Sequence, residues 1–507
     1  MLPSIAAAAL VAGLTTLLLA AASVGVGVGP SGGPRRDIGF RRTGPRRLVF
    51  EAFIVVGALA GAWLLRERGI RGTSSAGELP AADPLIAAVP ALVGLAAGLV
   101  AVRLYPLPIR LLAWLAAARK DLVPVLAMRR ATHGGSAGPV LVVLLATATI
   151  GAFSSAALVH LERAADAVAW QEVGAPFRIT STSGPLPRDL DPATLPGVES
   201  SAGAFRATIP IGLNGLRFEM LGLDVGRLDS VVGGTPADPN LPAELLGETG
   251  GPVPAIASRS LTGRPDGVEL GETFDATVEA YPFTFKVVEV RDTFPGMPLT
   301  GHFLVVSRDH LHAVAPNAPL APTAALLRAP DTAAPRLHES VAALGPGFAV
   351  ESRAERTAAL RGSPVLGAVR IGIAVAALVA AAYAALAVAA ALALAGLGRA
   401  VEVAHLRTMG LTRGEAFGLV VAEHGPTVLV AFGAGLALGL GLFVILQPGL
   451  GLTALVGSGL VVPLAIDPAQ LAIVLAAIVA IVALGMTLGA ALQRGAVPAT
   501  AVRRGFE

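Results

Sequence analysis

The chain has 507 residues, of which 54% are hydrophobic and only 14% are charged, whereas a soluble protein carries nearer a quarter charged residues. Together with a mean hydropathy of +0.70, this composition excludes an ordinary soluble protein and indicates an integral membrane protein. The absence of cysteine excludes disulfides, thiolate metal sites and a catalytic cysteine. The net charge of +3, carried by basic residues that flank apolar runs, argues against nucleic-acid binding.

Seven apolar runs are each long enough to form a membrane-spanning helix, which needs about 20 residues. We predict spans at 1–28, 48–65, 83–102, 139–160, 366–397, 418–446 and 468–490. The apolar run of the first span begins at residue 4, and the second and third spans together occupy 48–102. The predicted fold class is an α-helical polytopic membrane protein of about seven spans with an α+β extracytoplasmic domain between spans four and five.

Basic residues orient these spans, because Lys and Arg gather in the cytoplasmic loops of membrane proteins. Four segments concentrate them, which we predict to be a basic cytoplasmic loop (29–47), an amphipathic cytoplasmic linker (103–138), a cytoplasmic hairpin (398–417) and a cytoplasmic tail (491–507). The loop at 447–467 is predicted to be extracytoplasmic, because residues 447–466 contain no basic residue. Span 1–28 has a rival interpretation as a signal peptide cleaved near residues 20–22, which the lack of a basic start opposes.

Residues 161–365 lack long apolar runs and predict the extracytoplasmic α+β domain. Its first part, 161–172, continues span four as an amphipathic stalk, with Leu161, Ala164 and Val168 on one side. Alternating apolar and polar residues predict strands at 177–181, 205–211, 216–221, 268–270, 273–278, 285–290, 302–306 and 348–351, and a helix at 335–344.

A short charged hairpin, 398–417, separates two long apolar runs and must therefore face water, where a soluble partner can reach it. Its first half has helical spacing, and Gly410 is expected to end that short helix, while Thr412 is expected to cap the next one. Charged residues surround the helical side: Arg399, Glu402, Arg407, Arg413 and Glu415. The hairpin could thus receive force from outside the membrane.

This hairpin resembles the corresponding loop of the FtsX-like (MacB-like) permeases of ABC systems. Their pattern, R-x-x-E-hydrophobic-x-x-L-R-x-x-G-hydrophobic-x-R, is matched here by Arg399, Glu402, Val403, Leu406, Arg407, Gly410, Leu411 and Arg413, with Met409 and Glu415 in the same stretch and Glu423 opening the next span. In the family this loop joins the second and third spans of a four-span unit, after a large extracytoplasmic domain. Residues 267–274 also look like the β-rich lobe of a MacB-type domain.

The resemblance implies that 122–507 forms one four-span unit. The first three spans are similar to the parts that link two such units in long actinobacterial-type permeases. We therefore expect the chain to be the back part of a longer permease or one half of a split one.

The resemblance also implies a function: a permease subunit of an ABC exporter or mechanotransmission complex, spanning the plasma membrane several times. The alternative is an ABC-coupled regulator of cell-wall hydrolases or a sensor module, without transport. Because no Walker A motif is present, ATP is expected to bind a separate ABC ATPase subunit, and no cofactor is expected in this chain. The other partners implied are a second permease copy or separate permease half, the lipid bilayer, and a lipoprotein, peptide, amphiphile or wall hydrolase at the outer domain.

Further motifs carry less information. Gly134, Ser136 and Gly138 match a nucleophile elbow, yet they lie in a turn before span four, where a linker is the better interpretation. His310 and His312 alternate as on a strand face, and without a third ligand they predict surface histidines rather than a metal site. No paired polar residues lie deep in the spans, so no catalytic residue is predicted.

Two sets of residues are predicted to have structural roles. Glycines spaced four apart allow close helix packing in lipid, and the predicted pairs are Gly57 and Gly61, Gly94 and Gly98, Gly435 and Gly439, and Gly485 and Gly489. Chance is the competing explanation, because the chain has 60 glycines. Glu423 is predicted to brace the hairpin against Arg399 or Arg407.

Overall fold

The computed structural model of the protein describes residues 138–182, 184–211, 216–247, 251–262, 267–299, 301–408 and 413–450, and scattered residues within 49–100 and 460–484. The chain divides into two compact units. The helical unit comprises Met1–His160, Val369–Gly451 and Leu464–Glu507, and the sheet unit comprises Leu161–Ala368 and Leu452–Pro463.

Nine strands form one mixed sheet in the described part of the sheet unit. They are β1 (Phe177–Ser181), β2 (Ser200–Ile211), β3 (Leu216–Leu223), β4 (Val253–Ser258), β5 (Thr273–Val278), β6 (Tyr281–Arg291), β7 (Phe303–Ser307), β8 (Ala324–Arg328) and β9 (Phe348–Ser352). Their order is β5-β6-β4-β7-β3-β2-β8-β1-β9. The pairs β3–β7 and β4–β6 are parallel, and the other neighbours are antiparallel. Strands from distant parts of the chain therefore meet at the centre of the sheet.

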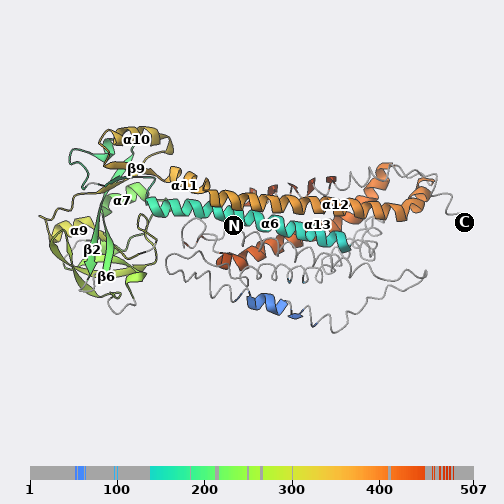
Figure 1. Ribbon diagram of the computed structural model, residues 1–507, viewed down its shortest axis with the longest axis horizontal. Coiled ribbons are helices and arrows are strands. Elements are labelled where there is room, and N and C mark those ends of the chain that lie inside the picture. Colours follow the sequence, from blue (N-terminus) through green and yellow to red (C-terminus); the bar gives the residue numbers. More distant parts are fainter. Residues whose placement is uncertain are drawn as a thin grey trace. The chain divides into compact units, whose positions relative to one another are not determined.

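Short helices connect and cover these strands (Figure 1). They are η1 (Pro192–Thr194), α7 (Val225–Val232), α8 (Ala243–Leu246), η2 (Arg259–Leu261), α9 (Arg308–Val314), η3 (Asp331–Ala333), α10 (Ala334–Ala342) and α11 (Arg353–Arg361). Helix α7 buries Leu228 and Val232 against one side of the sheet, where Leu221 and Phe303 lie. Phenylalanines fill the core on the other side: Phe205, Phe218, Phe283 and Phe285. Burial of these apolar surfaces on both sides stabilises the sheet.

Most predicted strands are confirmed, and the errors have physical reasons. Strands β1 and β5 have the predicted bounds, and β2, β3, β6, β7 and β9 overlap their predictions. The strand predicted at 268–270 is wrong: the segment forms no strand, and only Val268 enters the core. Strands β4 and β8, which are almost wholly buried and rich in alanine, were not predicted. A short run buried on both sides lacks the alternation that identifies a strand.

Three long helices extend into or form the helical unit: α6 (Gly138–Val173), α12 (Pro364–Thr408) and α13 (Arg413–Leu450). Among the described residues, three segments are long and apolar enough to cross a membrane, namely Val143–Val173, Pro364–Tyr383 and Leu429–Gln447. They overlap the spans predicted at 139–160, 366–397 and 418–446. The described residues of the predicted spans 48–65, 83–102 and 468–490 are helical, while 1–28 lies outside the described residues.

The turn between β5 and β6 holds two non-glycine residues in the left-handed region, Glu279 (φ 48°) and Ala280 (φ 70°). A two-residue hairpin with positive φ at both positions favours Asn-Gly, because a side chain other than that of Asn or Asp is strained there. We expect Ala280→Gly to raise the free energy of unfolding by about 0.5–1 kcal/mol. Chemical denaturation of the purified chain measures this change, and a lower stability would contradict the turn geometry.

Candidate functional site

The charged hairpin lies at the end of one long helix and the start of another. Helix α12 runs without interruption from Pro364 to Thr408, and α13 begins at Arg413. The predicted short helix before Gly410 is therefore wrong as a separate element, because it is the last part of the 45-residue helix α12. Five of the predicted coupling residues lie in the last ten residues of α12: Arg399, Glu402, Val403, Leu406 and Arg407.

The remaining predicted coupling residues lie either in α13 or outside the described residues. Arg413, Glu415 and Glu423 lie in α13, whereas Met409, Gly410, Leu411 and the predicted cap Thr412 lie outside the described residues. Charged residues thus gather at the end of α12 and at the start of α13. The bracing role of Glu423 stays a prediction.

One predicted glycine pair lies at a close helix contact. A Cβ atom added to Gly439 would lie 2.5 Å from the Thr149 carbonyl oxygen and 2.7 Å from the Ala152 Cβ, and one added to Gly435 would lie 2.5 Å from the Ala148 Cβ. These partners belong to α6, so the backbones of α6 and α13 approach closely here. Figure 1 shows α6, α12 and α13 side by side within the helical unit, and Thr147 Oγ1 donates to the Ala380 carbonyl at 3.2 Å.

No such close contact is found for the other predicted glycine pairs within the residues that the structure describes. A Cβ on Gly57 would meet nothing within 4 Å, and Gly61 is helical. Gly94, Gly98, Gly485 and Gly489 lie outside the described residues.

His310 and His312 lie on helix α9 rather than on a strand, which corrects the sequence interpretation. Positions two apart on a helix are separated by about 200°, so the two rings cannot share one ligand. His310 is also not a surface residue, since it is 5% exposed and its Nε2 contacts the Gly247 carbonyl oxygen at 2.5 Å. Of the elbow-like motif, 134–137 lie outside the described residues, and Gly138 begins α6.

A second polar site was not predicted: the junction, defined as the contacts that join the end of α6 to α11, β1, β2 and the turn 294–297. The α6 end is capped by Gly174 (φ 76°), whose N–H donates to the Trp170 carbonyl. The Gly296 N–H donates to the Gln171 carbonyl at 2.7 Å, and a Cβ on Gly174 would lie 2.8 Å from the Gly296 nitrogen. The helix end therefore packs backbone to backbone against this turn.

Ion pairs attach α11 to the same end of α6. The Arg353 guanidinium lies 3.1 Å from Asp166 of α6 and 3.1 Å from Asp331, and it stacks 4.9 Å from the centre of the Trp170 ring. One turn later, Arg356 donates to both carboxylate oxygens of Glu172, with Nη2 to Oε1 at 3.2 Å. This hydrogen bond raises the pKa of Arg356, against the opposing effect of burial.

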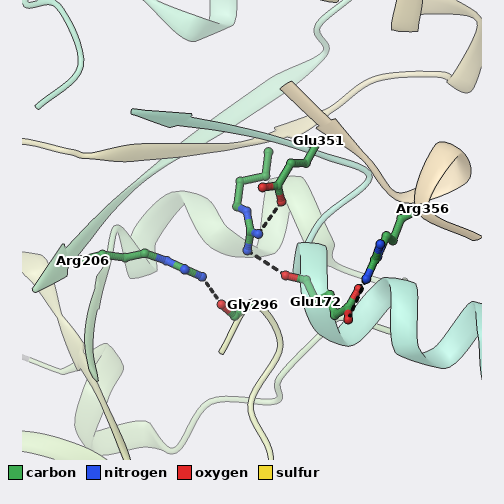
Figure 2. Close-up of polar contacts among 6 residues, drawn as sticks. Glu172, Arg206, Gly296, Glu351 and Arg356 are labelled. Atoms are coloured by element: carbon green, nitrogen blue, oxygen red, sulfur yellow. Dashed lines mark hydrogen bonds and ion pairs between the residues drawn. The ribbon is translucent and has the colours of Figure 1, made fainter. Parts of the chain in front are cut away.

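Two further arginines approach the junction from the sheet. Arg178 of β1 donates to the Glu172 carbonyl at 2.8 Å and to the Glu351 carboxylate. Figure 2 shows Arg206 reaching toward the Gly296 carbonyl, to which it donates, and Arg356 reaching toward Glu172. Burial and the positive charge of Arg178 lower the pKa of Arg206 to about 10, although Glu219 and Glu351 act in the opposite direction.

These side chains border a pocket of about 800 Å³ in the sheet unit. Its polar lining includes Arg178, Arg206, Glu219 and Glu351, and Met297 and Leu299 are among its apolar lining residues. Sequence reasoning could not find the pocket, because its members come from positions as far apart as 172 and 359 and follow no motif.

Comparison with known proteins identifies the C-terminal part of the chain. Residues 374–498 match a family model. That model describes the C-terminal part of FtsX-like permeases. This FtsX-like region, defined as residues 374–498, contains all the coupling residues predicted from Arg399 to Glu423. The predicted resemblance to FtsX-like permeases is thus confirmed, and it covers helix α13 and most of α12.

Two solved structures are each similar to about a third of the chain. The periplasmic region of MacB from Actinobacillus actinomycetemcomitans is 11% identical, over 38% of this chain and 95% of that one, with a TM-score of 0.22. The extracellular domain of the noncanonic ABC-type transporter YknZ from Gram-positive bacteria is 13% identical, over 32% of this chain and 84% of that one, with a TM-score of 0.20. No curated protein matches the chain.

Proposed function

We propose that the chain is a permease subunit of an ABC exporter or mechanotransmission complex in the plasma membrane. In this function a separate ATPase hydrolyses ATP, and the resulting movement reaches the sheet unit, which lies outside the cytoplasm. The observation that carries the proposal is the FtsX-like match over 374–498, because it includes the charged end of α12 and the charged start of α13. The apolar helices support the membrane location.

The continuity of α12 supports a mechanical role. The helix has 45 residues and its only proline is its first residue, Pro364, where proline is tolerated. At 1.5 Å per residue it extends for about 67 Å, more than twice the ~30 Å hydrocarbon core of a bilayer. One end carries Arg399–Arg407, and at the other end two residues separate α12 from Arg361, where α11 ends. A displacement of the charged end could therefore be transmitted along an unbroken helix.

The junction supports the same role at the receiving end. Helix α11, which leads into α12, is held to the end of α6 by Arg353–Asp166 and Arg356–Glu172. Arg178 connects that end to Glu351 beside α11. Such charge-assisted contacts are directional, so a movement of one helix would displace its partner and the attached strands.

No catalytic role is proposed for this chain. ATP would bind to the partner ATPase, since the sequence contains no Walker A motif, and no cofactor is assigned. The complex would also contain a second permease copy or a separate permease half. The alternative function, regulation of wall hydrolases or sensing without transport, differs only in what the sheet unit contacts, so it is distinguished by the identity of that partner.

Affinity purification of the tagged chain in a mild detergent tests the proposal. We expect a P-loop ATPase to co-purify, with ATP hydrolysis in the eluate. Glu402→Ala and Arg407→Ala are each expected to reduce its recovery on the order of tenfold or more, as loss of one central interface contact does. Arg504→Ala, in the C-terminal tail, is the control and should keep normal recovery. Absence of any ATPase from the wild-type eluate would overturn the proposal.

A further inference from the structure

One cation in the pocket is left without an acidic partner after the others are paired. Arg178 contacts Glu351, Arg356 contacts Glu172, and Glu355 contacts His338. Arg206 makes no ion pair within the described residues, and among them its guanidinium donates only to the neutral Gly296 carbonyl. A half-buried guanidinium with five donors and one neutral acceptor retains unused hydrogen-bonding capacity.

The sheet fixes the place of this guanidinium. Arg206 lies on β2 opposite Leu221 of β3, and Glu219 is the diagonal neighbour on the same face of the sheet. Glu219 is exposed and forms no recorded ion pair with Arg206. Burial and the nearby Arg178 nevertheless disfavour the charge of Arg206 and lower its pKa to about 10, although Glu219 acts in the opposite direction. An anion in the pocket would offset, through its attraction to Arg206, both the cost of burying this charge and its repulsion from Arg178.

The wall beside Arg206 is apolar. Met297, Pro298 and Leu299 line the pocket directly after Gly296, and Ala359 of α11 lines it as well. Binding pockets typically combine an apolar lining with a few placed polar groups. Here the charged group and the apolar wall lie in the same cavity of about 800 Å³.

We propose that this pocket binds an amphiphile with an anionic head group, a carboxylate or a phosphate, which Arg206 holds through its guanidinium. A planar guanidinium binds such oxyanions through two parallel hydrogen bonds. The apolar part of the ligand contacts Met297–Leu299. Of the pocket's carboxylates, Glu172 and Glu351 contact arginines and Glu355 contacts His338, which leaves the exposed Glu219 as the carboxylate that would favour a cationic head group. As a cargo site the pocket depends on the proposed function, whereas binding itself does not require an ATPase.

Binding of defined amphiphiles to the full chain in a neutral maltoside detergent tests this assignment. The probes are dodecyl phosphate, laurate, inorganic phosphate and dodecyltrimethylammonium, and affinities are compared at one detergent concentration. We expect dodecyl phosphate or laurate to bind, and Arg206→Gln to weaken that binding at least about tenfold. Arg206→Lys keeps the charge but loses the planar guanidinium, so its affinity for the probe is expected to lie between those of the wild type and Arg206→Gln. Which of the two probes binds more tightly identifies the head group.

Two further variants separate binding from folding. Ala359→Trp fills the pocket at an exposed position and should block binding while Arg206 remains. Arg227→Gln removes an exposed arginine of α7 and should bind like wild type. Equal binding by wild type and Arg206→Gln, in variants with unchanged thermal unfolding, would overturn the proposal. So would tighter binding of the cationic probe, and equal affinity for inorganic and dodecyl phosphate would overturn the amphiphile assignment. None of these outcomes depends on recovery of an ATPase.

Discussion

Substitution of Gly439 by alanine is expected to lower the stability of the helical unit by about 1–3 kcal/mol, the usual effect of overpacking. The added Cβ would lie 2.5 Å from the Thr149 carbonyl oxygen of α6, and backbone cannot move aside as a flexible side chain can. Gly439→Leu should be more severe and prevent recovery of a monodisperse protein. Thermal unfolding in detergent, followed by size-exclusion chromatography, measures both effects.

Gly441 provides the matched control for this substitution, because it lies on the same helix and a Cβ there would meet nothing within 4 Å. Gly441→Ala should therefore be neutral or stabilising by up to about 1 kcal/mol, as expected from helix propensity alone. If Gly439→Ala and Gly441→Ala behaved alike, the close contact between α6 and α13 would not exist in the protein.

Gly174→Ala is expected to destabilise the sheet unit by about 2–4 kcal/mol, through two effects that act together. Its φ of 76° is unfavourable for a residue with a Cβ, and that Cβ would lie 2.8 Å from the Gly296 nitrogen. The end of α6 would have to move away from the turn at 294–297, and the hydrogen bond from Gly296 to Gln171 would be lost. Limited proteolysis and thermal unfolding of the full chain report the change.

Gly234 separates the two contributions. It has nearly the same φ, 74°, but a Cβ there would meet nothing within 4 Å. Gly234→Ala should show only the backbone strain, about 1–2 kcal/mol. The excess in Gly174→Ala then measures the contact at the junction, and no excess would contradict it. Because the junction carries the proposed movement, Gly174→Ala should also weaken the coupling of ATP hydrolysis to the sheet unit.

Elements with a clear period could be predicted from the sequence. The stalk at 161–172 is an example, because Leu161, Ala164 and Val168 recur at helical spacing and all three are buried in α6. Strand β5 alternates between exposed and buried positions and was found with its exact bounds. Strands β4 and β8 have no such alternation, since they lie inside the sheet with both sides covered.

The two candidate sites differ in the same way. The coupling segment is contiguous, so a pattern of charges and glycines between apolar runs was enough to find it. The junction brings together Glu172, Arg206, Gly296 and Arg356 from four separate elements and turns. Nothing distinguishes these arginines locally in a chain with 38 basic residues, only two of them lysine. Only the strand order and the path of α6 place them near one another.

The uninterrupted course of α12 also restricts how the protein can vary in length. Each residue of an α-helix turns the chain by about 100°, so one inserted residue would rotate everything beyond it onto a different side. Seven inserted residues would restore the direction to within about 20°. A loop has no such fixed rotation per residue, so a change in its length does not rotate the elements beyond it in this way. Related chains should therefore keep the spacing between Pro364 and Arg399, or change it in whole heptads.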